Sequence, residues 1–206
     1  IAPAVTAGLP TLALRAPEHP VMRDLLESLD FPLAAPSANR SGYISPTSAQ
    51  HVLETLDGRI DAVIDGGACE AGLESTILAV RADGSLEELR PGPIRIDGLL
   101  SASSGRTDAS IEAPGQLASH YAPGKPLRLN AEAADAGEFL IGFGRIPGDC
   151  TLSASGDLNE AATRLYDCLH QAAASEYPRI AIVQIPDEGI GEAINDRLRR
   201  AATPAG

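Results

Sequence analysis

The chain has 206 residues, of which 44% are hydrophobic but only 3% are aromatic. This length suits one or two domains, and their cores must be built mainly from aliphatic side chains. The formal net charge of −12 disfavours nonspecific binding to nucleic acids, which requires clustered Lys and Arg. The sequence contains no apolar run of about 18 residues, so we predict no membrane-spanning helix.

The three cysteines, Cys69, Cys150 and Cys168, lie far apart in the sequence. Their spacing matches neither a zinc site nor a redox pair, and free cysteines are usually buried. We therefore expect three inert, buried thiols in a reducing, cytoplasmic setting.

Short apolar segments predict three strands in the first third of the chain. These segments are residues 11–15, 31–35 and 60–64. Between the first two, Met22, Leu26 and Leu29 recur at the spacing of one helical face. The first part of the chain is therefore expected to alternate strands with helices.

A second helix is predicted to start near residue 45. Ser45 followed by Pro46 is a helix-start signal, with Ser at the N-cap and Pro at the first helical position. We expect this helix to run to about Leu56, before an Asp-Gly pair that stops it. His19 and His51 would then lie on helix surfaces, and no histidine has the spacing of a metal site.

Residues 74–90 read as a β-hairpin. One arm is STILAV, the other is LEELR, and Ala-Asp-Gly-Ser at 82–85 is a strong turn signal between them. A Pro-Gly-Pro sequence ends the second arm, and residues 97–100 would form one helical turn. From about residue 101 the sequence is rich in Ser, Gly, Ala and Asp, which predicts a linker.

A second domain follows the linker. Residues 127–129 and 138–143 predict strands, and the continuous apolar run at 179–185 predicts a central parallel strand. Between them, Asp157 with Glu160 three residues later forms a capping-box pattern at the start of a helix. Alternating strands and helices predict a small three-layer α/β domain.

A final helix is predicted over residues 192–202. Its amphipathic pattern places two residues inward, Ile194 and Leu198, and three outward, Arg197, Arg199 and Arg200.

The strongest candidate for a ligand site is the stretch 32–52, PLAAPSANRSGYISPTSAQHV. Ser37 and Asn39 follow an apolar strand, and open α/β sheets bind ligands beyond the carboxyl ends of their strands. The helix that follows would direct its N-terminus towards an anion. Composition alone equally allows a polar loop whose side chains cap the backbone.

Two further features have open alternatives. Arg15 and Arg90 each end a strand, where an arginine either clamps a phosphate or carboxylate or lies on the solvated surface. His120 and Tyr121 stand between Pro-Gly breaks, and the tyrosine could stack on a base or pack as a linker aromatic.

Five motifs in this order, PLAAPSANRSGYISPT, IDAVIDGG, ESTILAV, LRPGPI and SHYAP, resemble the YrdC-like threonylcarbamoyl-AMP synthase family in its long form. NDRLRRAA near the C-terminus is also similar to the long form. The resemblance implies an α/β fold. Residues 1–100 would be the C-terminal half of a YrdC-like twisted-sheet domain, 101–125 a linker, and 126–206 a small three-layer Rossmann-like domain.

The resemblance also implies a reaction. L-threonine, bicarbonate and ATP, with Mg²⁺ on the triphosphate, would give threonylcarbamoyl-adenylate and pyrophosphate, and the product would pass to tRNA-modifying proteins. No covalent enzyme nucleophile is needed, because the carbamate oxygen attacks the α-phosphate. Catalysis would rest on positioning and charge neutralisation, with no catalytic side chain.

The site residues implied by the resemblance fall into two sets. Threonine contacts are expected at Arg15, Ser37 and Thr76, with Ser75 a close rival of Thr76. ATP contacts are expected at Thr11, Asn39, Thr47, Arg90 and Tyr121.

Two alternatives have different functions. A YrdC-like module could bind double-stranded RNA without catalysis, although the net charge of −12 argues against it. A carbamoyl-transferring relative, as in hydrogenase maturation, fits the SHYAP linker and the C-terminal domain poorly. Since a complete YrdC-like domain would begin about a hundred residues earlier, within ordinary domain sizes, we expect this chain alone to be inactive or barely active.

Overall fold

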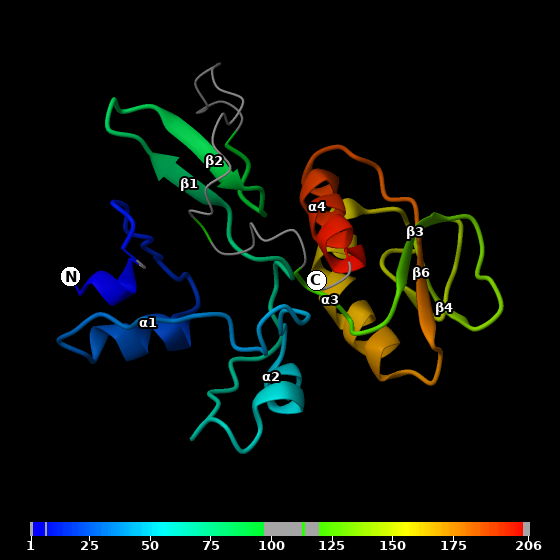
Figure 1. Ribbon diagram of the computed structural model, residues 1–206, viewed down its shortest axis with the longest axis horizontal. Helices are drawn as coiled ribbons and strands as arrows, with labels where there is room; N and C mark the ends of the chain where they lie inside the picture. Colours follow the sequence, from blue (N-terminus) through cyan, green and yellow to red (C-terminus); the bar gives the residue numbers. More distant parts are fainter. Residues whose placement is uncertain (1, 7, 97–112, 114–119, 204–206) are drawn as a thin grey trace.

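The computed structural model describes residues 2–6, 8–96, 113 and 120–203. The chain forms an N-terminal part with few regular elements and a C-terminal α/β domain, which lie side by side (Figure 1). The turn predicted at 97–100 and most of the predicted linker lie outside the described residues.

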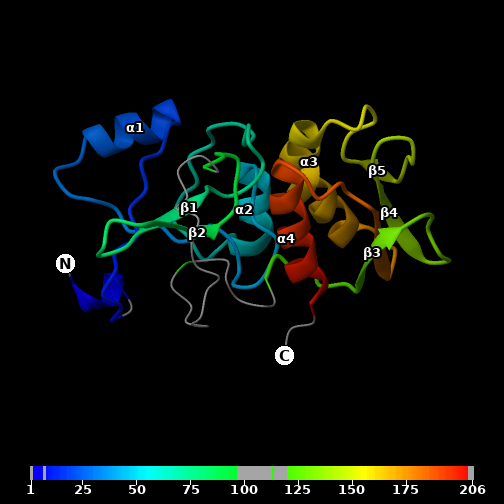
Figure 2. The same ribbon diagram turned by 90° about the horizontal axis from the view of Figure 1, so that it is seen from above.

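The N-terminal part contains helices and a hairpin, and in the view of Figure 2 its first α-helix lies farther from the C-terminal domain than its second α-helix. Its elements are the 3₁₀ helix η1 (Pro3–Val5), the helices α1 (Pro20–Glu27) and α2 (Ala49–Leu56), and the strands β1 (Ile77–Val80) and β2 (Leu86–Arg90). The predicted hairpin is confirmed, since β1 and β2 pair antiparallel. The Arg81 N–H donates to the Ser85 carbonyl at 2.8 Å and closes the turn.

The three strands predicted at 11–15, 31–35 and 60–64 are wrong, since none of these segments is a strand. Backbone N–H and C=O groups need a neighbouring strand to form a ladder, and the described chain pairs none with them. Their apolar side chains are accordingly exposed, with Leu14 at 87%, Ile64 at 63% and Phe31 at 55%.

Helix α2 begins later than predicted. Its N-cap is Ser48, whose hydroxyl accepts from the His51 N–H at 3.3 Å. Ser45, the expected cap, donates instead to Glu74 at 2.5 Å. The predicted end at Leu56 is confirmed, whereas His51 is only 8% exposed and not a surface residue as predicted.

The C-terminal domain follows the predicted element order. It comprises β3 (Leu127–Ala131), β4 (Glu138–Gly142), β5 (Cys150–Thr151), α3 (Leu158–Ala174), β6 (Arg179–Val183) and α4 (Ile190–Ala202). The four strands are parallel in the order β3-β6-β4-β5, so β6 is central as predicted. Asp157 caps α3 by accepting two N–H bonds at 2.8 Å, but Glu160 accepts from Ser153 and does not complete a capping box.

Both helices of this domain pack on the same face of the sheet, and they also contact each other. Ile141, Ile180 and Ile182 of that face are at most 1% exposed. A smaller cluster that includes Leu140 and Val183 closes the opposite face. The α/β class is thus confirmed, and α3 and α4 form one layer against the parallel sheet.

The expectation of three buried free thiols is wrong. Cys150 on β5 and Cys168 on α3 form a disulfide, and Cys69 is free and exposed. The sequence could not reveal the pairing, because a strand end and a helix interior become neighbours only when α3 folds onto the sheet.

The N-terminal part packs directly on α3. A Cβ added to Gly72 would lie 2.3 Å from the Thr163 Cα, and the Thr163 hydroxyl donates to the Glu70 carbonyl at 2.8 Å. Ile44 and Leu73 of the N-terminal part join the core of the C-terminal domain. Within the described residues, no helix is long and apolar enough to cross a membrane.

Gly72→Ala should loosen this contact. Gly72 has φ of +68°, and its Cβ would collide with backbone atoms of α3. Left-handed backbone costs an alanine about 1–2 kcal/mol, and overpacking adds about 1–3 kcal/mol. Gly84→Ala is the matched control, because Gly84 has φ of +83° but no atom within 4 Å of its Cβ. Denaturant unfolding should show the larger loss for Gly72→Ala, and equal losses would contradict the close approach.

Reduction of the disulfide should destabilise the C-terminal domain. Cys150 and Cys168 are 18 residues apart, and closing a loop of this size contributes about 3 kcal/mol. Adding a thiol reductant should lower the melting temperature of the unsubstituted chain and of Cys69→Ser equally. A melting temperature that does not respond to reductant would contradict the Cys150–Cys168 disulfide. Such a bond is rare in the reducing compartment predicted for this chain.

Candidate functional site

The contact between the two parts centres on the carboxylate of Glu74, in the segment that leads into β1. It accepts from the Ser45 hydroxyl at 2.5 Å and from Arg197 Nε at 3.2 Å. The Tyr166 hydroxyl lies 2.9 and 2.8 Å from its two oxygens. These four residues, here called the Glu74 cluster, come from a turn, the segment before β1, α3 and α4.

The charges of the Glu74 cluster are removed from water. The Glu74 side chain is 17% exposed and that of Arg197 is 0% exposed. Burial alone would raise the pKa of Glu74, but Arg197 and the bonds from Ser45 and Tyr166 outweigh it and lower this pKa. Burial likewise opposes the charge on Arg197, and Glu74 nevertheless raises the pKa of Arg197. The pair is therefore ionised at neutral pH.

Arg197 was predicted to point outward from the last helix, and this is wrong. It lies on the same side of α4 as Ile194, Leu198 and Ala201, all of which are buried. The sequence held a signal for this position, because Arg197 is three residues from Ile194 and four from Ala201. A buried arginine requires a partner, and no pattern in the sequence identified Glu74 as that partner.

The backbone after Glu74 is held by a second arginine. Arg90, 5% exposed at the end of β2, donates from Nε and Nη2 to the Ser75 carbonyl at 3.1 and 2.8 Å. Burial lowers the pKa of Arg90, and Glu74 opposes this effect. The absence of a side chain at Gly92 lets this segment approach the backbone of residues 74–76, since a Cβ there would lie 2.4 Å from the Thr76 N.

The side chains of the two residues after Glu74 differ in their surroundings. The Thr76 hydroxyl donates to the Ile94 carbonyl at 2.8 Å and accepts from the Ile94 N–H at 3.1 Å. Ser75 is exposed, and within the described chain no hydrogen bond engages its hydroxyl. Of the two rival candidates for threonine binding, Ser75 thus presents the hydroxyl that no described residue engages.

Two predicted ATP ligands are buried at the same contact. Tyr121 is 1% exposed with φ of 63°, and its ring lies 5.6 Å from that of Tyr166 and beneath the Arg197 guanidinium. Its hydroxyl has no hydrogen-bond partner among the described residues. Thr47 is 7% exposed, and its N–H and hydroxyl contact His51 Nδ1 at 3.3 and 3.2 Å.

The remaining predicted ligands lie outside the Glu74 cluster. Thr11, Arg15 and Ser37 are exposed, and no hydrogen bond, ion pair or ring contact in the described chain joins them to it. Asn39 donates from Nδ2 to two carbonyls of its own turn, at 2.9 and 3.1 Å. The structure thus brings together Thr47, Ser75, Thr76, Arg90 and Tyr121, and leaves outside this group the exposed Thr11, Arg15 and Ser37 and the half-buried Asn39.

Two stacked histidines lie beside the Glu74 cluster. The rings of His51 and His170 are 3.8 Å apart and nearly parallel. His170 Nε2 lies 3.2 Å from the Ser45 carbonyl, and its Nδ1 lies 3.4 Å from Glu54. Asp167 lies 3.7 Å from His51 Nε2. Burial and the His51 ring lower the pKa of His170, which the Ser45 carbonyl and the nearby carboxylates of Glu54 and Asp167 offset only in part.

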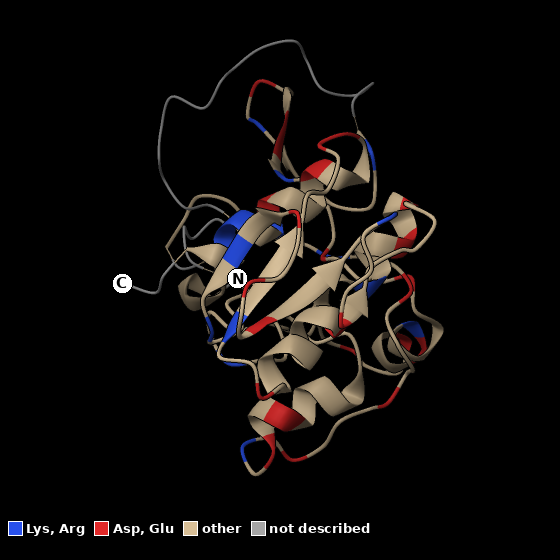
Figure 3. Ribbon diagram, turned by 90° about the vertical axis from the view of Figure 1, so that its right-hand side faces the viewer, with Lys and Arg blue, Asp and Glu red and all other residues tan. Residues whose placement is uncertain are grey.

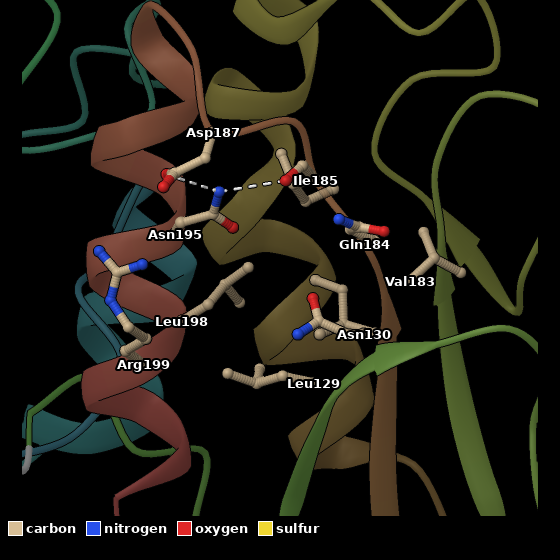
Figure 4. Close-up of a pocket in the computed structure, with 10 residues that line it drawn as sticks. Leu129, Asn130, Val183, Gln184, Ile185, Asp187, Asn195, Leu198 and Arg199 are labelled. Atoms are coloured by element: carbon tan, nitrogen blue, oxygen red, sulfur yellow. Dashed lines mark hydrogen bonds between the residues drawn. The ribbon is translucent and has the colours of Figure 1, made fainter.

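A separate pocket of about 230 Å³ opens in the C-terminal domain, between the carboxyl ends of β3 and β6 and helix α4 (Figure 4). Asn195 donates across it to the Ile185 carbonyl and to Asp187, both at 3.1 Å. None of the predicted ligand residues lines this pocket. Among the described residues, no group of three or more His, Cys, Asp or Glu could hold a metal ion.

Fold and site together define a two-part α/β protein in which polar residues of the N-terminal part are fixed by the C-terminal domain. Residues 84–203 match the family described as "Threonylcarbamoyl-AMP synthase, C-terminal domain", and residues 1–92 match the Sua5, YciO and YrdC family described as "Telomere recombination". The chain belongs to the threonylcarbamoyl-AMP synthase family, as the sequence motifs predicted.

Individual relatives agree with this assignment. The chain is 36% identical to threonylcarbamoyl-AMP synthase of Bacillus subtilis, over 98% of this chain and 66% of that protein. It is 33% identical to the Pyrococcus abyssi enzyme, over 96% and 66%. The crystal structure of P. abyssi Sua5 complexed with L-threonine superposes with a TM-score of 0.83 and 30% identity, covering 98% of this chain and 67% of that one. The chain thus spans about two thirds of the length of these relatives.

The histidine pair predicts a pH dependence of stability. Folding lowers the pKa of His170. At a pH below the ordinary histidine pKa of about 6.5, the unfolded chain therefore binds more protons at this residue than the folded chain does. The stabilisation is therefore complete above about pH 6.5 and is lost as the pH falls, by at most about 1.4 kcal/mol per pH unit. Unfolding titrations between pH 8 and pH 5 should show this slope.

His170→Gln is the matched variant, since the glutamine amide can still donate to the Ser45 carbonyl but does not titrate. It should flatten the slope between pH 8 and pH 5. An unchanged slope in the variant would assign the pH dependence to other groups.

Proposed function

We propose that the chain acts in L-threonylcarbamoyladenylate synthesis, forming threonylcarbamoyl-AMP and pyrophosphate from L-threonine, bicarbonate and ATP. The observation that carries this proposal is the superposition of 98% of the chain on P. abyssi Sua5, whose crystal structure contains L-threonine. Relatives that are 33–36% identical are named threonylcarbamoyl-AMP synthases, which makes the proposed enzyme a nucleotidyltransferase.

The proposed threonine residues are Arg15, Ser37, Ser75 and Thr76. Arg15 is exposed, and its guanidinium has the fork geometry that binds a carboxylate with two hydrogen bonds. Ser37 and Ser75 carry exposed hydroxyls that can bind the polar groups of an amino acid. The exposure of Arg15, Ser37 and Ser75 supports their roles, whereas the Thr76 hydroxyl is already bound to the Ile94 backbone.

The proposed ATP residues are Thr11, Asn39, Thr47, Arg90 and Tyr121. Arg90 can bring positive charge towards the phosphates from the end of β2. Tyr121 is 1% exposed, so a contact with ATP would require the segment around it to move away from α3 and α4. Its hydroxyl, which lacks a partner among the described residues, is then the group available to a nucleotide.

The proposed chemistry needs no covalent intermediate with the protein. The carbamate oxygen of carboxylated threonine attacks the α-phosphate, and pyrophosphate leaves. The protein aligns the two reactants and neutralises charge on the phosphates. Mg²⁺ would be held by the triphosphate oxygens, the hard ligands it prefers.

We further propose that the product serves tRNA-modifying proteins in the cytoplasm. We do not assign double-stranded RNA binding, because the net charge is −12. In the ribbon of Figure 3, Lys and Arg positions are also spread over several elements of the described chain, whereas a clustered basic patch or stripe is the usual mark of nucleic-acid binding.

Isothermal titration with L-threonine and with ATP tests the proposal. Because the chain spans 66% of its relatives, the titration should use both this chain and a version extended N-terminally, with pyrophosphate release as the second measurement. Arg15→Met should weaken threonine binding about tenfold by removing the carboxylate partner. Arg23→Met, on the exposed face of α1, is the control and should bind threonine normally.

Failure of both versions to bind L-threonine would overturn the proposed function. Equal effects of Arg15→Met and Arg23→Met would instead reject Arg15 as the carboxylate ligand.

A further inference from the structure

Arg197 and Tyr166 belong to the C-terminal domain, which carries none of the proposed ligand residues, yet both bind the residue that precedes Ser75. Arg197 Nε lies 3.2 Å from the Glu74 carboxylate, and the Tyr166 hydroxyl lies 2.8 Å from it. The separation in sequence between Arg197 and Glu74 is 123 residues. The contact therefore joins the N-terminal part to the C-terminal domain at the residue next to Ser75 of the candidate site.

We propose that Arg197 and Tyr166 are positioning residues for L-threonine, acting through Glu74 on the backbone of Ser75 and Thr76. This inference rests on the proposed function, because it takes those two residues as threonine ligands. The C-terminal domain would then help to shape the threonine site without touching the substrate.

The segment is held from several directions at once. Glu74 is bound by the Ser45 hydroxyl from one side and by α3 and α4 from the other. The Ser75 carbonyl accepts two bonds from Arg90. The Ser75 carbonyl is thus engaged, whereas the Ser75 side chain is exposed. The contacts fix the backbone and leave the hydroxyl available to a ligand.

Removal of Arg197 would leave Glu74 without its only arginine contact in the described cluster. A carboxylate that is 17% exposed then either protonates or moves towards water. Ser75 is the adjacent residue, so a displaced Glu74 carries the Ser75 hydroxyl with it. A shift of about 1 Å in a positioning group is enough to weaken the alignment of a substrate strongly.

The experiment compares Arg197→Met and Tyr166→Phe in the version of the protein that binds L-threonine. Arg197→Met should raise the Kd for threonine about tenfold, and Tyr166→Phe, which keeps the buried ring, about threefold. The Kd for ATP should change by less than about twofold. Arg197→Lys should restore part of the threonine affinity. Arg199→Met, on an exposed position of the same helix, should bind threonine normally.

Hydrogen exchange supplies a readout that does not depend on binding. In Arg197→Met, amides of residues 75–78 should exchange faster, while those of β6 stay protected. Wild-type threonine affinity in both Arg197→Met and Tyr166→Phe, or faster exchange without loss of affinity, would overturn the inference. If Arg197→Met does not fold, Tyr166→Phe alone decides. If no version binds threonine, the proposed function fails, and the exchange data still test the contact.

Discussion

The burial of one carboxylate, that of Glu74, is the constraint on which the contact between the two parts depends. An unpaired buried carboxylate costs several kcal/mol, so Glu74 can leave water only where enough donors meet it. Those donors are supplied by Ser45 from the turn, Tyr166 from α3 and Arg197 from α4. The two parts of the chain therefore satisfy the charge only in one relative position, and apolar contacts such as Leu73 against the core assemble around it.

This constraint explains why Ser45, in the polar turn before α2, does not cap the helix as its sequence context predicted. Ser45 was a good N-cap candidate, but its hydroxyl satisfies Glu74, and Ser48 caps the helix three residues later. Thr47 is likewise held by His51, within the stacked histidine pair. The turn thus divides into a buried end that binds the C-terminal domain and an exposed end, at Ser37, that remains available to a ligand.

The C-terminal domain was largely predictable because its signals are local. The apolar run of β6 and the Asp157 cap of α3 each depend on a few neighbouring residues. The strands expected at 11–15, 31–35 and 60–64 failed because a strand depends on partners elsewhere. The same reason hid the Glu74 cluster: Arg197 was predicted to point outward, and the partner that allows it to be buried lies 123 residues away. Family resemblance indicated the ligand residues and gave no information on what holds them.

Apolar contacts and the ion pair contribute differently to this arrangement. Apolar burial is nondirectional and tolerates small slides of one surface over another, so Ile44 and Leu73 can hold the parts together without fixing their register. A charged pair with directed hydrogen bonds loses its compensation when either partner shifts. The Glu74–Arg197 pair therefore fixes the position of the N-terminal part on the C-terminal domain, which the apolar contacts alone would only hold together. Since Ser75 follows Glu74 directly, that position also fixes where the Ser75 hydroxyl of the candidate threonine site lies.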